Sequence, residues 1–193
     1  MSSTSAPFGL RPANHPSGAV RTERMTIGTG YASTIYQNQP VKISAAEDSS
    51  EGTIVVAAAG DTFIGTFQGV EWTDSDGRRR FSNKWTASTA GTDIVCYVTI
   101  DPTIVYEIQS NAALTIDMIG SQFDFSAAAG DTTTGFSSQT LDVSSRVDTA
   151  GAGTAGVRLI GITPGADNAW GDTYVVARVQ IVEHQNTATK NAY

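Results

Sequence analysis

Histidine and cysteine, the residues best suited to acid–base, nucleophilic or metal chemistry, are scarce in this chain. His15 and His184 are the only histidines among 193 residues, and Cys96 is the only cysteine. A structural zinc site takes roughly four closely spaced ligands, and neither histidine has a cysteine or a second histidine near it in sequence. The sequence therefore predicts no metal site, no cofactor and no disulfide within the chain.

Nucleophilic catalysis is harder to judge, because the members of a Ser–His–Asp triad can come from any part of a chain. The Gly-x-Ser-x-Gly turn that presents the serine of many hydrolases is absent. Paired carboxylates such as Asp74 and Asp76 are better explained as solvated turn residues. We therefore expect a protein that is not an enzyme, although the sequence leaves a triad open.

Two short motifs resemble binding loops but lack the context that such loops need. The run Gly151–Gly156 fits G-x-G-x-x-G, yet it precedes a predicted strand instead of linking a strand to a helix. The run Asp74–Gly77 begins like a calcium loop, but Arg79 and Trp85 stand where an EF-hand has glycine and glutamate. Neither motif predicts a ligand, and Asp74–Gly77 predicts a hairpin turn.

The charge balance is acidic, with 12 basic and 19 acidic residues and a net charge of −7. A nucleic-acid or anionic-membrane surface calls for a basic face, so we expect neither partner. Arg78, Arg79 and Arg80 form the one basic cluster. This cluster is explained either as the solvated shoulder of a hairpin or as a docking contact for acidic side chains of a partner.

The pattern of short apolar segments separated by turn residues predicts an all-β fold, either a single β-sandwich or a barrel-like domain. Residues 114–119 fit either a helical turn or a short strand. The expected strands lie near residues 41–43, 53–57, 63–72, 78–81, 94–100, 105–109, 123–125, 139–143, 157–162 and 174–182.

The N-terminal residues differ from the rest, because three of the six prolines fall within the first sixteen positions. Proline removes a backbone donor and extends the residue before it, so this stretch can be neither a helix nor a central strand. We expect an extended arm over residues 1–30 and a β-rich body over 31–193. The arm residues expected to contact a partner are Phe8, Leu10, Arg11, Pro12 and His15.

Several stretches in order along the chain resemble the capsid cement, or head decoration, proteins of tailed bacteriophages. Each stretch is modest alone, and their order and spacing carry the resemblance. The stretches are Ala6–Pro12 with His15–Gly18, Phe67–Asp74, Asp101–Pro102 with Val105–Gln109, Pro164–Asp172 and Val182–Gln185.

The resemblance implies a virion structural protein without catalysis, made in the bacterial host cytoplasm and carried on the outer capsid surface. Such a protein would bind the expanded icosahedral head and clamp neighbouring subunits of the major capsid protein. It would commonly be a homotrimer at three-fold positions, and a dimer stays open. Phe8, Leu10 and Arg11 would anchor the arm to the capsid or to a neighbouring copy.

Two other function classes stay open at this point. The first is a glycan- or receptor-binding β-domain of a virion, for which exposed aromatic side chains on a β-sandwich would suffice. The second is a hydrolase on a β scaffold, which ranks last because so few acid–base groups are present.

Overall fold

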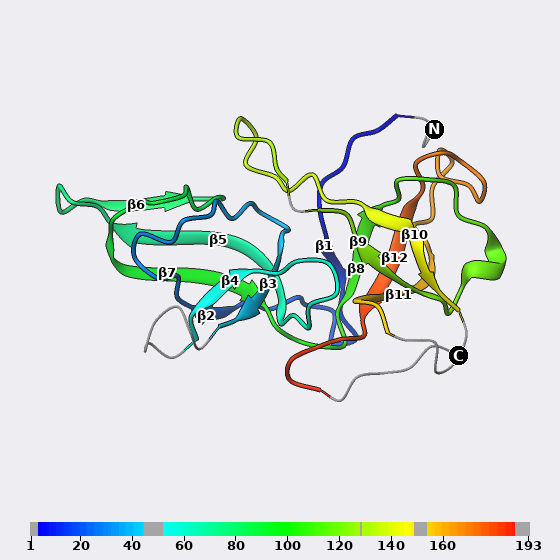
Figure 1. The fold of residues 1–193 in the computed structure, drawn as a ribbon, viewed down its shortest axis with the longest axis horizontal. Helices are drawn as coiled ribbons and strands as arrows, with labels where there is room; N and C mark the ends of the chain where they lie inside the picture. Colours follow the sequence, from blue (N-terminus) through cyan, green and yellow to red (C-terminus); the bar gives the residue numbers. More distant parts are fainter. Residues whose placement is uncertain (1–3, 45–51, 128, 149–153, 188–193) are drawn as a thin grey trace.

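The computed structural model describes residues 4–44, 52–127, 129–148 and 154–187. In this part of the chain there are twelve strands and one 3₁₀ helix, and the strands form two antiparallel sheets (Figure 1). Two antiparallel sheets with almost no helix are consistent with a β-sandwich, so the predicted all-β class is confirmed. No helix within these ranges is long and apolar enough to cross a membrane.

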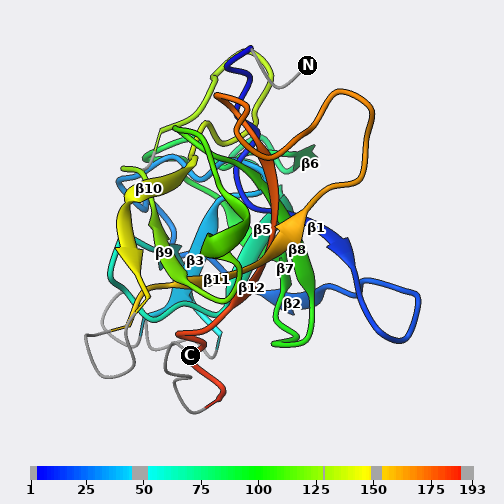
Figure 2. The ribbon, with the colours of Figure 1, turned by 90° about the vertical axis from the view of Figure 1, so that its right-hand side faces the viewer.

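One sheet, here the β8 sheet, has the strand order β1-β8-β12-β11-β9-β10. Figure 2 looks toward this sheet, with β10 at the left and β1 at the right. Its members are β1 (Arg11–Asn14), β8 (Val105–Gln109), β9 (Gln122–Phe125), β10 (Leu141–Val147), β11 (Val157–Ile162) and β12 (Val176–Ile181).

The other sheet, here the β5 sheet, has the order β2-β7-β5-β3-β4, and β6 pairs with the outer half of β5. Figure 1 shows the two sheets as lobes that lie side by side. The members of the β5 sheet are β2 (Glu23–Met25), β3 (Pro40–Ile43), β4 (Ile54–Val56), β5 (Gly65–Thr73), β6 (Arg79–Ser82) and β7 (Thr92–Thr99).

Each sheet buries a hydrophobic cluster of its own. In β12, Ala177, Val179 and Ile181 are buried and alternate with half-buried residues, as the two-residue period of a strand requires. They pack in the β8-sheet cluster with Tyr106 and Phe123. The β5-sheet cluster is built around Phe67, Trp85, Cys96 and Val98, together with buried isoleucines.

The two clusters meet where residues from one lobe reach into the other. Phe63 lies between β4 and β5 of the β5 sheet in sequence. It nevertheless packs edge-on against Phe125 in the β8-sheet cluster, with ring centroids 5.5 Å apart. Gln185 bonds both backbone groups of Ile43, at 2.7 and 3.2 Å. Polar and apolar contacts therefore join the lobes.

The hairpin predicted at Asp74–Gly77 is confirmed. The amide of Gly77 donates to the carbonyl of Asp74, and the amide of Asp74 donates to the carbonyl of Arg78, both at 2.9 Å. Gly77 has a φ of 77°, which a glycine adopts without strain. The segment 114–119, which fitted two structures, contains the 3₁₀ helix η1 (Ile116–Met118).

The predicted extended N-terminal arm is not confirmed. Residues 11–14 form β1, which pairs with β8, and residues 23–25 form β2, which pairs with β7. The segment thus supplies an edge strand to each sheet. Proline fits at position 12 because an edge strand needs hydrogen bonds on one side only. Local sequence shows that such a segment is extended, but not whether it pairs with its own body.

Candidate functional site

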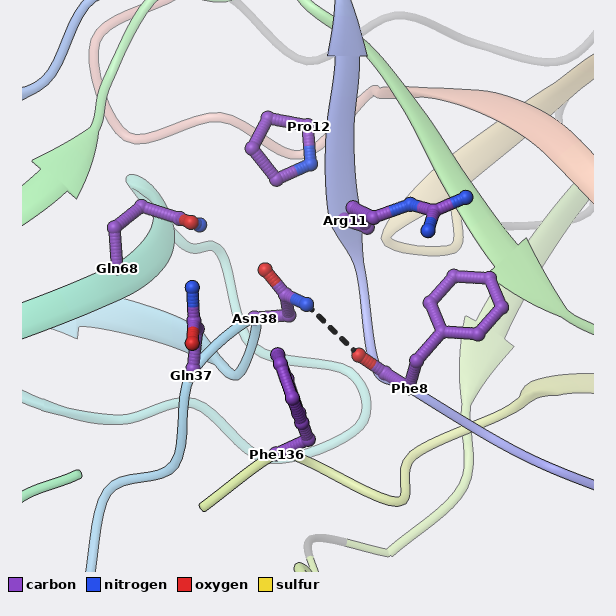
Figure 3. Close-up of a pocket in the computed structure, with 7 residues that line it drawn as sticks. All are labelled: Phe8, Arg11, Pro12, Gln37, Asn38, Gln68 and Phe136. Carbon is purple, nitrogen blue, oxygen red and sulfur yellow. Dashed lines mark hydrogen bonds between the residues drawn. The ribbon is translucent and has the colours of Figure 1, made fainter. Parts of the chain in front are cut away.

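An open groove of about 380 Å³ lies between β1 and β5, where the two lobes meet. Figure 3 shows the seven side chains that line it, with the N-terminal segment on one side. Opposite it lie Gln37 and Asn38 before β3, Gln68 in β5, and Phe136 from the segment between β9 and β10. The seven lining residues are Phe8, Arg11, Pro12, Gln37, Asn38, Gln68 and Phe136. Three of the residues predicted to contact a partner, Phe8, Arg11 and Pro12, are thereby brought to one place.

Asn38 fixes the N-terminal wall of this groove. Its side-chain amide donates to the carbonyl of Phe8 at 3.1 Å, and its own carbonyl accepts from the amide of Leu10 at 2.8 Å (Figure 3 shows the first). Gly9 between them has a φ of 75°, and a Cβ there would lie 2.6 Å from the Asn38 carbonyl oxygen. The chain therefore passes close to Asn38 in one backbone conformation.

Leu10 was predicted to contact a partner, and the structure contradicts that prediction. Its side chain is fully buried in the β8-sheet cluster. Phe8, two residues earlier, is only half-buried and stays at the groove. The buried Leu10 side chain anchors the N-terminal segment to the folded body. Leu10 therefore contributes to stability, and its side chain is not accessible to a partner.

Arg11 supplies the positive charge of the groove. One guanidinium nitrogen lies 2.5 Å from a carboxylate oxygen of Glu107, and the guanidinium carbon lies 4.6 Å from the centre of the Phe8 ring. Glu107 also accepts from the Thr163 hydroxyl at 2.9 Å. The cation is half exposed, at 52% for its side chain, but its position is fixed by these contacts.

The opposite wall comes from residues that the sequence did not single out. Phe136 is 39% exposed and follows a loop in which Asp131 accepts from the amide of Thr133 at 2.7 Å. Hydrogen bonds from Thr133 and Thr134 hold the pKa of Asp131 below its usual range. Phe136, Gln37 and Gln68 come from three separate segments, so no sequence motif could have grouped them.

His15 lies apart from this groove, in a second hollow of about 240 Å³. Its Nε2 is 3.0 Å from a carboxylate oxygen of Asp101, and its Nδ1 is 2.6 Å from the hydroxyl of Ser17. Arg21 and Ala19 complete the lining. The sequence suggested no link between His15 and Asp101, because 85 residues separate them (101 − 15 − 1).

The arginines predicted as a docking cluster lie on the β5–β6 hairpin and are paired within it. Arg79 contacts Glu71 at 3.2 Å, and Arg80 contacts Asp74 at 3.2 Å. Arg78 contacts Asp76 at 3.4 Å. Three arginines paired with three carboxylates leave this hairpin nearly neutral. This favours the explanation that the arginines are solvated side chains of a hairpin and not a docking contact.

Glu71 is the best connected of these carboxylates. It accepts from the Tyr97 hydroxyl at 3.0 Å, and Arg24 and Arg79 lie near it. The Tyr97 hydroxyl, followed by Arg79, lowers the pKa of Glu71 from its ordinary value. Phe81, which pairs with Glu71 across the hairpin, is 72% exposed, so the hairpin also presents an apolar ring to solvent.

The described ranges hold no group of three or more His, Cys, Asp or Glu side chains that could bind a metal ion. Residues 151–153 of the glycine motif lie outside the described residues. Burial raises the pKa of Cys96 to about 12, so this thiol stays protonated at neutral pH.

No family model matches the chain, and no curated protein or solved structure is significantly similar to it. The likeness to phage cement proteins therefore stays a prediction, and function has to be argued from the residues themselves.

Proposed function

We propose that this protein is a structural cement protein that binds the outer surface of an expanded phage head and clamps neighbouring major capsid subunits. One observation carries the proposal. One of the stretches that resemble cement proteins, residues 6–12, forms a wall of an open groove and presents Phe8 and Arg11 there.

Physical chemistry supports such a groove as a protein contact. Aromatic and arginine side chains in a concave, preformed site are the usual energetic centres of protein interfaces. Because Glu107 holds the Arg11 guanidinium, and that guanidinium lies against the Phe8 ring, little side-chain entropy is lost when a partner binds. The groove chemistry is apolar rings, amides and one cation, which suits an extended peptide segment of the partner.

The proposed mechanism is stabilisation by binding. A ligand that binds only the expanded shell stabilises that shell, and the stabilisation grows with the logarithm of the free ligand concentration relative to its dissociation constant. Self-association, as a homotrimer at three-fold positions or a dimer at two-fold positions, would add avidity without new contacts. The protein would then act on the virion surface after synthesis in the bacterial cytoplasm.

A glycan- or receptor-binding role is the second candidate, and the lining of the groove favours it over a hydrolase at this place. Phe8 and Phe136 offer apolar faces, while Gln37, Asn38 and Gln68 offer amide donors and acceptors. Sugar sites combine these two kinds of side chain. A glycan array with the whole protein distinguishes the candidates, since a cement protein should bind no glycan.

The test is occupancy of purified expanded heads that lack this protein. We expect the wild type to co-sediment with heads at a copy number close to that of the major capsid protein. We expect the double variant Phe8→Ala/Phe136→Ala to lose most of that binding. The matched control is Ile119→Ala, which removes a side chain that is 48% exposed and lies outside the groove.

Two results would overturn the proposal. One is a wild type that fails to bind heads or binds only a few copies per particle. The other is full occupancy by the double variant, which would show that the groove plays no part.

A further inference from the structure

His15, Ser17 and Asp101 form a linked chain of side chains in the second hollow. The Ser17 hydroxyl lies 2.6 Å from His15 Nδ1, and His15 Nε2 lies 3.0 Å from Asp101 Oδ2. The other Asp101 oxygen accepts from the Thr103 amide at 2.8 Å and the Thr103 hydroxyl at 2.6 Å. The carboxylate is therefore held in place from behind.

The backbone decides which nitrogen of His15 carries the proton in the neutral ring. The amide of Ser17 donates to Nδ1 at 3.1 Å, so Nδ1 must hold the lone pair. Nε2 then carries the hydrogen and donates it to Asp101. The Nδ1 lone pair is therefore shared between the Ser17 amide and the Ser17 hydroxyl, whose other contact is the Ala19 carbonyl at 3.4 Å. The ring is in the tautomer that a general base requires.

This arrangement has the proton-transfer logic of a Ser–His–Asp triad, with the roles of the two ring nitrogens exchanged. The carboxylate orients the imidazole and stabilises its cation, and the imidazole can accept the serine proton. Hydrogen bonds from Thr103, followed by the contact with His15, lower the pKa of Asp101, which keeps it ionised.

The surroundings allow a substrate to reach the serine. Ser17 is exposed, while the side chain of His15 is only 17% exposed. Arg21 lines the same hollow, and a guanidinium can stabilise the negative charge that develops on an acyl oxygen. Arg21 and Asp101 are the charged residues among those that line the hollow.

We propose that Ser17 is a nucleophile, that His15 is its general base, and that this site cleaves small, accessible carboxylic esters. Ser17 Oγ forms a bond to the acyl carbon while its proton passes to His15 Nδ1. The ester C–O bond breaks, and the alcohol leaves with that proton. Water then attacks the acyl carbon and gives a proton to His15. The bond between Ser17 Oγ and the acyl carbon breaks, His15 returns the proton to Oγ, and the carboxylic acid leaves.

This activity is independent of the cement role, because the hollow and the groove share no lining residue. Asp101 is a positioning residue, since it acts through His15. A purely structural turn would show the same hydrogen bonds without reactivity, so the test must measure chemistry.

The first experiment uses the full chain with p-nitrophenyl acetate and a fluorophosphonate probe. We expect ester hydrolysis and a single adduct that peptide mass spectrometry places on Ser17. Ser17→Ala and His15→Gln should each lower the rate by roughly 100-fold or more. Ser75→Ala, at an exposed serine of the β5–β6 hairpin, should leave the rate unchanged.

The second experiment tests the base without relying on ester turnover. Ser17→Cys should react with iodoacetamide faster than Ser75→Cys, and adding His15→Gln should remove the difference. Asp101→Asn should lower that rate in the Ser17→Cys protein, because it removes the carboxylate that orients the His15 ring. Hydrolysis unchanged in Ser17→Ala, no adduct on Ser17, or equal alkylation of the two cysteines would overturn the proposal.

Discussion

Leu10 and Asn38 are joined by a backbone hydrogen bond of 2.8 Å that links the two halves of the molecule. Leu10 is buried in the β8-sheet cluster, whereas the amide of Asn38 donates to Phe67 in β5. Asn38 holds a φ of 64°, a conformation that non-glycine residues seldom adopt. This hydrogen bond, one of several contacts between the lobes, therefore depends on an unusual backbone position.

Two substitutions of Asn38 distinguish the contribution of its side-chain hydrogen bond from the contribution of its backbone conformation. Asn38→Gly keeps the positive φ without strain but loses the bond to Phe8, and we expect a cost of about 1 kcal/mol. Asn38→Ala also strains the backbone, and we expect about 1–2 kcal/mol more. Urea unfolding of the three proteins measures both costs, and equal stability of the two variants would contradict the strain argument.

Leu10→Ala should destabilise the protein by about 2–5 kcal/mol, because it leaves a cavity in the β8-sheet cluster. Phe8→Ala is the matched control, since it shortens a half-buried side chain of the same segment. We expect Phe8→Ala to cost less stability and to affect head binding more. A Leu10→Ala protein as stable as the wild type would show that residues 4–14 are not part of the folded body.

Gly65 and Gly161 give a matched pair for testing close backbone approach. Their φ values are nearly equal, at 157° and 159°. A Cβ on Gly65 would lie 1.5 Å from the carbonyl oxygen of Thr99, while a Cβ on Gly161 has nothing within 4 Å. We expect Gly65→Ala to cost at least about 3 kcal/mol and Gly161→Ala distinctly less. Thermal unfolding of the pair decides whether the contact or the dihedral angle dominates.

The Lys42–Asp61 pair should make stability fall at low pH. Lys42 Nζ lies 2.7 Å from Asp61, and this bond is the main cause that lowers the pKa of Asp61. A lowered folded-state pKa means that the stabilisation is present above the unfolded value of about 3.9 and is lost as pH falls through the folded value. Because both side chains are about one-third exposed, the effect is at most about 1 kcal/mol.

Asp61→Asn tests this sign directly. The variant should be less stable than the wild type at pH 7, and the difference should shrink between pH 7 and pH 2.5 as Asp61 takes up a proton. Asparagine can still accept the bond that Ala58 donates to position 61. A stability difference that stays constant between the two pH values, measured by urea unfolding, would assign it to something other than the ion pair.

The strands could be predicted because their signals are local. Val176–Ile181 alternates in burial, with Ala177, Val179 and Ile181 buried, and the Asp-Gly pair at 76–77 marks a turn by its own chemistry. The predicted N-terminal arm is not confirmed, because residues 11–14 pair with β8, which lies far away in sequence. Prolines predict an extended chain equally well for a free arm and for an edge strand.

In the candidate sites, too, only residues that are close in sequence could be grouped before the structure was known. Phe8, Arg11 and Pro12 could be grouped in advance because they are neighbours in sequence. Phe136 and Gln68 could not, since they face the groove only through the pairing of distant strands. The same holds for His15 and Asp101, whose contact exists only because β1 pairs with β8.

The order of strands also constrains how a newly made chain can fold. β12 is the last strand along the chain, yet it lies between β8 and β11 in the sheet. On the ribosome, β1 and β8 can pair early, but the β8 sheet has no centre until residues 176–181 have emerged. Long-range pairing of this kind raises contact order and slows folding. Until β12 is made, the nascent protein would therefore expose unpaired edges of β8 and β11, which are prone to aggregation. Its yield at high temperature would then depend on chaperones more than on its native stability.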